Sequence, residues 1–149
     1  MRSQDDGVRH ASECWSNGYN CAESVLRGVC FGMEVELPDR ALMMATPLGG
    51  GIGRSEDTCG ALVAGVMAIG ALKGRTMPGQ DRFASYEAAG RLYKHFNEAF
   101  GSTCCRVLNK SDFKSPEHKE RCGRFVAETT SMAMRILKND VEDRTKMTA

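Results

Sequence analysis

Hydrophobic residues recur at helical spacing along most of the chain, and runs that alternate apolar and polar positions are missing. Apolar side chains three or four positions apart lie on one face of an α-helix, whereas a half-buried strand requires strict alternation. The segments with helical spacing are about 5–16, 20–33, 38–45, 58–72, 80–100 and 115–137. One further short helix is expected after Ser102 or Thr103, either of which would cap it, with Cys104 and Cys105 in its first turn. The pattern thus predicts an all-α fold, a single-domain bundle of about five to seven helices.

Sequence signals at the ends of these segments support the same boundaries. Asn20, with a glutamate three residues later, has the pattern of a capping box. Ser115 is followed by proline, which is favoured at the first position of a helix. Beyond residue 137 the sequence turns polar. We therefore expect residues 1–137 to form the helical domain and residues 138–149 to form a frayed tail.

Two of the expected helices have an unusual composition. The segment 58–72 is crowded with glycine and alanine, and each glycine inside a helix costs about 1 kcal/mol relative to alanine. Close approach of another helix or of a cofactor is expected to compensate for that cost. The segment 80–100 carries an aromatic stripe at helical spacing. This stripe predicts a core-facing side formed by Phe83, Tyr86, Tyr93, Phe96 and Phe100.

Length and charge limit the classes of function. A chain of 149 residues is one domain of ordinary size, which needs no disulfides to hold its core. Its 20 Lys and Arg residues nearly balance 19 Asp and Glu residues, so we expect no nucleic-acid partner and no membrane partner. The N-terminus lacks the apolar core of a signal peptide, and the most apolar stretch, 60–72, is shorter than the ~20 residues that span a bilayer. We therefore expect a soluble, cytoplasmic protein, whose small-residue helix serves either an internal contact or a homodimer.

A glycine-rich loop, Gly49-Gly-Gly-Ile-Gly53, leads into the segment 58–72. Asp57 or Ser55 would cap that helix, which places Cys59 in its first turn. Free backbone N–H groups and the positive end of the helix dipole stabilise an anion there, so we expect the Cys59 thiol to ionise more readily than in water. Cys59 is therefore a candidate nucleophile or metal ligand.

The same loop contains the backbone positions that we expect beside a cofactor, Gly50, Gly51 and Gly53. It does not predict a nucleotide site, because no strand precedes it and no Lys-Ser or Lys-Thr closes it. Arg54 would hold an anion or pair with Glu56. The three histidines have no ligand spacing, so we expect surface positions for His10, His95 and His118.

Seven cysteines are many for a chain of this length. An odd number in a reducing compartment argues against a disulfide framework and favours metal or redox use, although no CxxC pair occurs. Cys14 and Cys30 are expected in the core. Cys104 and Cys105 are neighbours on a helix and point about 100° apart, so at most one of them enters a shared site.

Three of the cysteines follow predicted helix caps, and a fourth lies on the apolar face of the last long helix. The four are Cys21, Cys59, Cys105 and Cys122. If the helix starts meet, several dipole ends and free amides surround sulfur. Such an arrangement suits clustered thiolates, which otherwise repel one another.

Several stretches together resemble the C_GCAxxG_C_C family, which is described as redox-active. They are Gly18–Leu26, Gly49–Arg54, Cys59–Ala61, Phe100–Arg106 and Cys122. Their order is specific, and the resemblance covers about residues 8–137. One departure is Ala64, which stands where the last glycine of the motif belongs, with Gly65 directly after it.

The resemblance implies that the family's four recurring cysteines map to Cys21, Cys59, Cys105 and Cys122. The family is similar to a helical domain of split-Soret cytochromes, and this similarity implies a [2Fe–2S] cluster held by cysteines. The covalent haem motifs of those cytochromes are missing here. The leading hypothesis is accordingly a [2Fe–2S] protein that passes single electrons to a redox partner protein. Amides around the four thiolates would stabilise its negative charge.

Three alternatives stay open at the level of the sequence. The first is a thiol–disulfide oxidoreductase in which Cys59 attacks and another of the four cysteines resolves. The second is a helical interaction protein, without cofactor or catalysis, whose cysteines pack as small hydrophobic residues. The third is a four-thiolate zinc site. No motif supports a hydrolase or a transferase, so electron transfer or thiol redox chemistry is favoured over both.

Overall fold

The computed structural model describes residues 1–148, and every regular element in that range is helical. The prediction of an all-α, single-domain fold is confirmed. Within this range there are seven α-helices and one short 3-10 helix. In chain order they are α1 (Gln4–Ser16), α2 (Cys21–Gly32), α3 (Asp39–Met43), η1 (Thr46–Leu48), α4 (Gly60–Lys73), α5 (Phe83–Phe100), α6 (Cys105–Leu108) and α7 (Pro116–Thr148).

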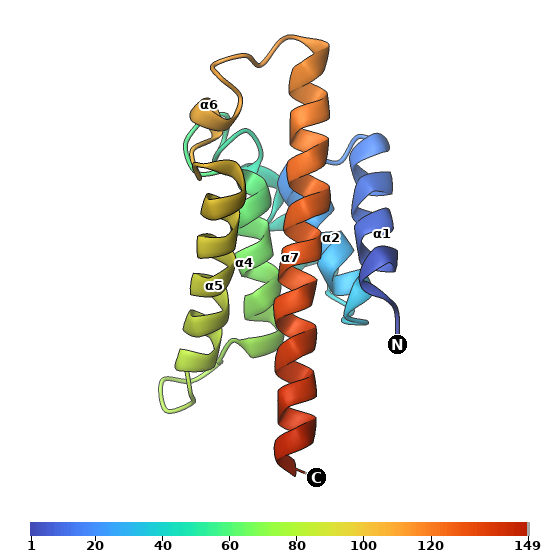
Figure 1. Cartoon of the computed structure of the whole chain (residues 1–149), viewed down its shortest axis with the longest axis vertical. Coiled ribbons are helices and arrows are strands. Elements are labelled where there is room, and N and C mark those ends of the chain that lie inside the picture. The colour runs from blue at the N-terminus through green and yellow to red at the C-terminus, as the bar shows by residue number, and fades with distance from the viewer. Residues whose placement is uncertain (149) are drawn as a thin grey trace.

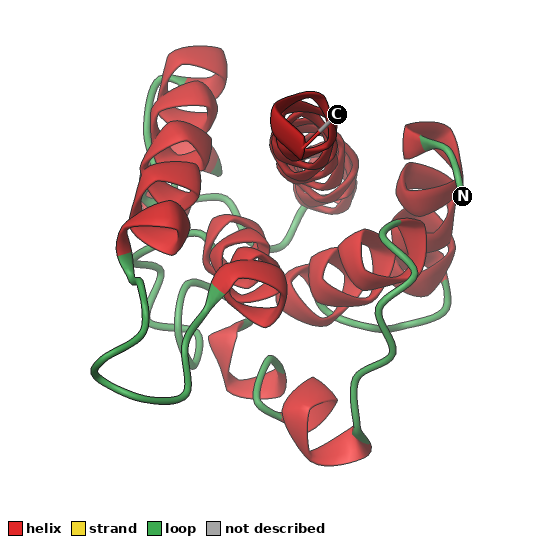
Figure 2. Ribbon diagram, turned by 90° about the horizontal axis from the view of Figure 1, so that it is seen from below, coloured by secondary structure: helices red, strands yellow, loops and turns green. Residues whose placement is uncertain are grey.

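The long helix α7 organises the bundle. It runs the length of the molecule, with α1 and α2 on one side and α4 and α5 on the other (Figure 1). Seen along its axis, α7 lies between α1 and α5, and it packs against α1, α2, α4 and α5 (Figure 2). Among residues 1–148, no helix combines the length and apolar character of a bilayer span.

Close packing between helices explains two glycines in the core. A Cβ on Gly28 would lie 2.9 Å from the Gly7 carbonyl oxygen, so α1 and α2 meet at these two residues. A Cβ on Gly65 would lie 2.8 Å from Leu92 and 3.2 Å from Thr129, at the point where α4 meets α5 and α7. The expected compensation for glycine in α4 is therefore helix packing at this position.

The core-facing side predicted for α5 is wrong in part. Phe96 is fully buried and Phe100 is half-buried, but Phe83, Tyr86 and Tyr93 are 67%, 64% and 53% exposed. Helix α5 turns a different face, which includes Leu92, toward α4 and α7. The three exposed rings lie roughly 100–180° around the helix from Leu92, where no other helix covers them.

The expected frayed tail beyond residue 137 is helical in the structure, because α7 continues to Thr148. Asp140 anchors this extension, since its carboxylate lies 2.8 Å from Lys73 Nζ and 2.8 Å from Arg91 Nη2. Burial alone would raise the pKa of the Asp140 carboxyl, but hydrogen bonds from the two cations outweigh it and lower the pKa. The paired charge lets a polar segment pack against α4 and α5.

Candidate functional site

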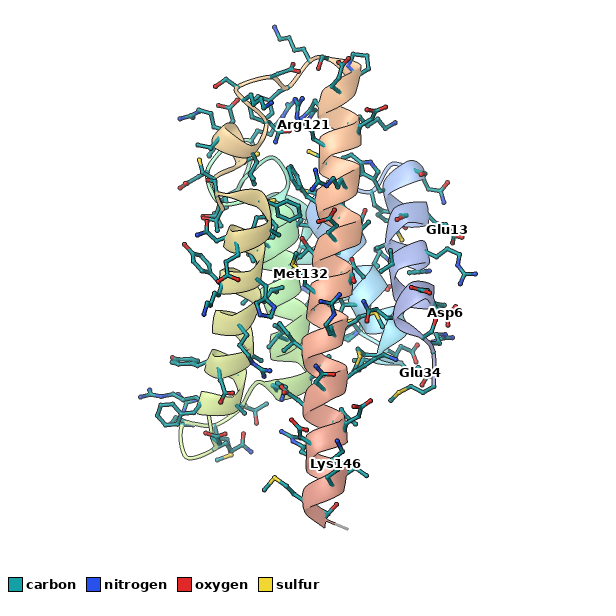
Figure 3. The ribbon with its side chains drawn as sticks, in the orientation of Figure 1. Asp6, Glu13, Glu34, Arg121, Met132 and Lys146 are labelled. Carbon is teal, nitrogen blue, oxygen red and sulfur yellow. The ribbon has the colours of Figure 1, made fainter. Side chains whose placement is uncertain are left out.

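A cavity of about 340 Å³ lies at the end of the bundle that carries α6 and the start of α7. Figure 3 shows Arg121 near the start of α7, at this same end. The cavity wall contains four of the seven cysteines, Cys21, Cys59, Cys105 and Cys122. Four elements that are distant in sequence thus contribute thiols to one space.

Cys21 is the first residue of α2, and the predicted capping box sets its position. Asn20 Oδ1 accepts a hydrogen bond from the Glu23 amide at 2.9 Å, and Glu23 Oε1 accepts one from the Asn20 amide at 3.0 Å. Asn20 also donates to the Thr46 carbonyl at 2.9 Å, which ties the start of α2 to η1. The local sequence therefore fixes this corner of the cavity.

Cys59 and Cys105 are brought together by a short extended pairing. Thr58 and Cys104 form an antiparallel bridge, in which the Cys59 amide donates to the Thr103 carbonyl at 2.8 Å and the Cys105 amide donates to the Asp57 carbonyl. Because this pairing continues to the Cys59 amide, α4 begins only at Gly60. Cys59 is thus itself the N-cap residue of α4.

The caps expected for the two later helices are wrong in the same way. Neither Asp57 nor Ser55 caps α4, and α6 begins at Cys105 with Cys104 as its N-cap residue. The Ser102 hydroxyl does accept a hydrogen bond from the Cys104 amide at 3.0 Å. Backbone pairing between the two segments satisfies the amides of Cys59 and Cys105, which side-chain caps were expected to satisfy.

The glycine-rich loop has an uncommon backbone. Five consecutive residues, 50–54, have φ between 56° and 70°. This left-handed conformation costs a non-glycine residue roughly 1–2 kcal/mol, so glycine is required at most of these positions. A Cβ on Gly51 would lie 2.7 Å from Cys105 Cβ and 2.6 Å from the Asp57 amide nitrogen. The loop backbone therefore packs directly against Cys105.

The three loop glycines expected beside a cofactor differ in position. Gly50 lines the cavity, and its amide donates a hydrogen bond to the Cys21 sulfur. Gly51 lies behind Cys105, whereas Gly53 is not part of the cavity wall. Of the two alternatives for Arg54, pairing with Glu56 is wrong, because Glu56 pairs with Arg106 at 3.1 Å. Arg54 instead lines the cavity.

Burial dominates the electrostatics of the four thiols. It raises the pKa of Cys59 to about 12 and that of Cys122 to about 12, and it raises the pKa of Cys21 and of Cys105 as well. Repulsion between thiolates adds to burial. The charge of Cys21 further raises the pKa values of Cys59, Cys105 and Cys122. The expectation that Cys59 ionises readily is therefore wrong for the free thiol.

The amides at the helix starts oppose burial without overcoming it. Backbone N–H groups of Ala61 and Leu62 donate to the Cys59 sulfur and lower its pKa. Cys21 receives hydrogen bonds from the amides of Gly50, Ala22 and Ala61. The donors that were expected around sulfur are present, but desolvation of the thiolate is the larger effect.

No group of three or more His, Cys, Asp or Glu side chains in residues 1–148 is arranged to hold a metal ion. Sulfurs bound to a single zinc lie no more than about 4.6 Å apart, given Zn–S bonds near 2.3 Å. All seven cysteines are free thiols. Within residues 1–148 the four thiols thus share one cavity wall without forming a group of that kind, and the zinc alternative stays a prediction.

The remaining cysteines lie elsewhere. Cys14 and Cys30 are buried in the core, as predicted. Cys104 is not part of the cavity wall, and its thiol donates to the Glu56 carbonyl at 3.6 Å. Of the two adjacent cysteines only Cys105 faces the cavity, but the expected reason is wrong, because Cys104 is an extended residue before α6 and not its neighbour on the helix.

Sequence reasoning missed two polar residues of the cavity wall. His118, expected at the surface, lines the cavity with Nδ1 3.7 Å from Cys122 Sγ. Asn109, which is 1% exposed, contacts the sulfurs of both Cys105 and Cys122. A buried asparagine leaves no periodic signal in a sequence.

Of the other two histidines, His95 is exposed as predicted, whereas His10 is half-buried and stacks on Phe31.

The chain matches one protein family over most of its length. The family model described as "Putative redox-active protein (C_GCAxxG_C_C)" matches residues 19–136. The chain belongs to this family. Comparison with curated proteins and with solved structures gives no significant match. The C_GCAxxG_C_C match begins just before Cys21 and ends after Cys122, so it includes all four thiols of the cavity.

Within this C_GCAxxG_C_C chain, the departure at Ala64 has a simple structural setting. Ala64 is fully buried, and Gly65 beside it makes the close approach to α5 and α7. A small residue at each position is compatible with that packing. Gly60 has a different role, because a Cβ there would lie 2.9 Å from Cys21 Sγ and 2.6 Å from the Leu48 carbonyl oxygen.

Proposed function

We propose that Cys21, Cys59, Cys105 and Cys122 hold a [2Fe–2S] cluster and that the protein passes single electrons to a redox partner protein. The observation that carries the proposal is the presence of these four thiols in the wall of one cavity. Membership of a family described as redox-active supports the same class of chemistry.

The residues around the cavity fit the group in three respects. Four cysteine thiolates are the usual ligand set of a two-iron cluster. The cavity volume of about 340 Å³ falls within the range of small-ligand sites. A two-iron cluster divides its ligands between two metals, so its four sulfurs need not converge on one point. The absence of a single-ion arrangement in residues 1–148 is therefore compatible with the cluster.

When bound, the cluster would supply a one-electron couple. The chain's own groups would set the conditions for it. Amides at the starts of α2 and α4 donate to the sulfurs of Cys21 and Cys59, which offsets the negative charge of clustered thiolates. Because burial raises the pKa values of the thiols, loading the site would release protons and would be favoured by higher pH.

The same pKa values weigh against the thiol–disulfide alternative. A nucleophilic cysteine acts as the thiolate, and a pKa of about 12 leaves Cys59 almost entirely protonated at neutral pH. A purely packing role is less consistent with the cavity, because packing cysteines fill space. Cys30 is the example of that behaviour in this molecule.

Replacing the cysteines one at a time tests the proposal. The protein and its variants are loaded with iron and sulfide without oxygen, and bound iron and visible absorption are measured after desalting. We expect Cys21→Ser, Cys59→Ser, Cys105→Ser and Cys122→Ser each to lower bound iron at least about tenfold. Cys30→Ser, at an equally buried position outside the cavity, is the control and should keep it. Four cavity variants that load like the wild type would refute the proposal.

A further inference from the structure

We infer that Asn109 is a positioning residue of the four-cysteine site, which fixes Cys105 relative to Cys122 and donates an N–H group to the Cys105 sulfur. The inference deepens the proposed function. Its first half concerns the thiol protein itself and does not require a cluster, whereas its second half rests on the proposed cluster.

The contacts of the Asn109 side chain reach both sulfurs. Nδ2 donates to Cys105 Sγ at 3.7 Å and to the Cys105 carbonyl at 3.1 Å. Oδ1 accepts from Cys122 Sγ at 3.8 Å, lies 3.0 Å from His118 Nδ1, and accepts from Arg121 Nε at 3.3 Å. The side chain is 1% exposed, so these partners replace the water that it loses on folding.

The two ends of the amide have different roles. Asn109 is the C-cap residue of α6, so its backbone moves with Cys105. Its Oδ1 is held by Cys122, His118 and Arg121, which all belong to α7. The carbonyl end therefore joins α6 to α7, while the NH₂ end points back into α6 and toward the Cys105 sulfur.

Other contacts hold the two ends of α6, since Arg106 pairs with Glu56 and Arg121 Nη2 donates to the Asn109 carbonyl at 3.3 Å and to the Asp112 carbonyl at 3.0 Å. None of these contacts reaches the sulfurs. Helix α6 has only four residues and makes no extensive contact with another helix. Upstream, Cys105 is fixed through the pairing of Cys104 with Thr58, which relates it to Cys59 but not to Cys122. Downstream, Lys110 and Ser111 both have positive φ, so the chain turns sharply away from α6. The Asn109 side chain is in contact with the sulfurs of both Cys105 and Cys122, so it bears directly on their separation.

The NH₂ end has a second consequence in a loaded site. A donor aimed at a ligand sulfur stabilises the more negative, reduced form and so raises the reduction potential. Loss of that donor should lower the potential even where the position of Cys105 is kept. A residue that only connects two helices would not have this effect.

Two variants separate the two roles. Asn109→Leu is similar in size and removes both ends of the amide. Asn109→Asp keeps an oxygen for His118, Arg121 and Cys122 but removes the N–H donor. Thr130→Val is the control, because Thr130 is a fully buried polar residue of α7 whose hydroxyl donates only to the Val126 carbonyl.

The first measurement is amide hydrogen exchange of residues 103–112 in the thiol protein, without iron. We expect Asn109→Leu to speed exchange by at least about fivefold, the size expected for the loss of one net hydrogen bond, and Thr130→Val to leave it close to the wild type. Asn109→Asp loses the bond to the Cys105 carbonyl but keeps its oxygen toward α7, so its exchange should lie between the two. Unchanged exchange in Asn109→Leu would overturn the positioning role, whether or not the protein binds a cluster.

The second measurement is the reduction potential of protein loaded with iron and sulfide without oxygen, monitored by electron paramagnetic resonance. We expect a lower potential in both Asn109 variants, more so in Asn109→Asp because of its added charge, and no change in Thr130→Val. A wild-type potential in either Asn109 variant would overturn the donor role. A wild-type protein that binds no iron would instead refute the proposed function and leave the exchange result to decide the positioning role.

Discussion

Cys30 and Cys59 are almost equally buried, at 4% and 5% exposed, yet their surroundings differ. Burial is the only influence on Cys30, and it raises the pKa of that thiol to about 11. Around Cys59, burial acts together with the thiols of Cys21 and Cys105 and with two amide donors. Burial therefore does not distinguish a packing cysteine from a site cysteine. The difference lies in which groups the fold places beside the sulfur.

The two parts of the bundle that contain these cysteines are built differently. On the opposite face of the helix that carries Cys30, α1 and α2 approach so closely that glycine is needed at their contact, and Met134 of α7 packs against Gly7 and Gly32. Around Cys59, the chain encloses a cavity of about 340 Å³ and surrounds it with loops and helix starts. Substitutions in the first part should lower the free energy of unfolding. Substitutions in the second part should mainly lower iron binding at the cysteines.

The largest effect on stability is expected from Gly28→Val in the packed part. A Cβ at Gly28 would already lie 3.0 Å from Ala11 Cα and 2.9 Å from the Gly7 carbonyl oxygen, so a branched side chain must separate α1 from α2. We expect a loss of about 3 kcal/mol in the free energy of unfolding, measured by urea denaturation. A loss below about 1 kcal/mol would show that this contact is loose.

Gly51→Ala should disturb the cysteine cavity, and its main effect should be on iron loading and not on stability. The residue has φ of 70°, and a Cβ there would lie 2.7 Å from Cys105 Cβ. We expect a stability loss of about 1–2 kcal/mol together with a several-fold loss of bound iron after anaerobic loading. Normal loading at reduced stability would contradict the role of the loop in placing Cys105. Gly53→Ala is a matched control, because it shares the positive φ but has nothing within 4 Å.

Asp140→Asn should change stability at neutral pH without touching either cysteine environment. Asparagine leaves the ammonium group of Lys73, 8% exposed, without its ionic partner, at a cost of about 2 kcal/mol. Thermal or urea denaturation checks the loss, and iron loading should be unchanged. A variant as stable as the wild type at pH 7 would contradict the anchoring role of Asp140.

The same pair of proteins should show a pH dependence with a definite sign. The folded-state pKa of Asp140 is lowered from its ordinary value of 3.8. Its contribution is therefore complete above the pKa of the unfolded chain and is lost as pH falls through the folded-state pKa. The stability difference between wild type and Asp140→Asn should be constant from pH 7 to about pH 5 and should shrink below pH 4. A difference that grows on acidification would be the wrong sign.

The smallest effect is expected for Gly90→Ala in α5. A Cβ at Gly90 meets nothing within 4 Å, so the substitution brings only the helix preference of alanine. We expect a gain in the free energy of unfolding of about 0.5–1 kcal/mol, measured by urea denaturation, with unchanged iron loading. A loss of stability would contradict the open surroundings of Gly90, and with them the contrast with Gly28.

The sequence pattern was sufficient for features that depend on neighbours along the chain. Helical periodicity predicted the all-α fold, and the Asn20 capping box was confirmed by its two reciprocal hydrogen bonds. The burial of Cys14 and Cys30 was also predicted correctly. In each case the signal, a helical spacing or a cap, can be read from residues close together in the sequence.

Features that depend on contacts between distant segments were not predictable in this way. The pKa of Cys59 follows from its burial by other segments, which outweighs the helix start beside it. The pairing of Thr58 with Cys104 moved both predicted caps, and Asn109 acquires its role only because α6 meets α7. The helical tail likewise depends on Lys73 and Arg91, about 50 or more residues upstream of Asp140.

The most direct test of the central claim is the iron and sulfide content of the wild-type protein prepared without oxygen, together with its electron paramagnetic resonance spectrum after reduction. The account predicts about two iron and two sulfide per chain and a spectrum from a single unpaired electron. A folded protein that binds neither iron nor sulfide under these conditions, with all seven thiols still titratable, would contradict it.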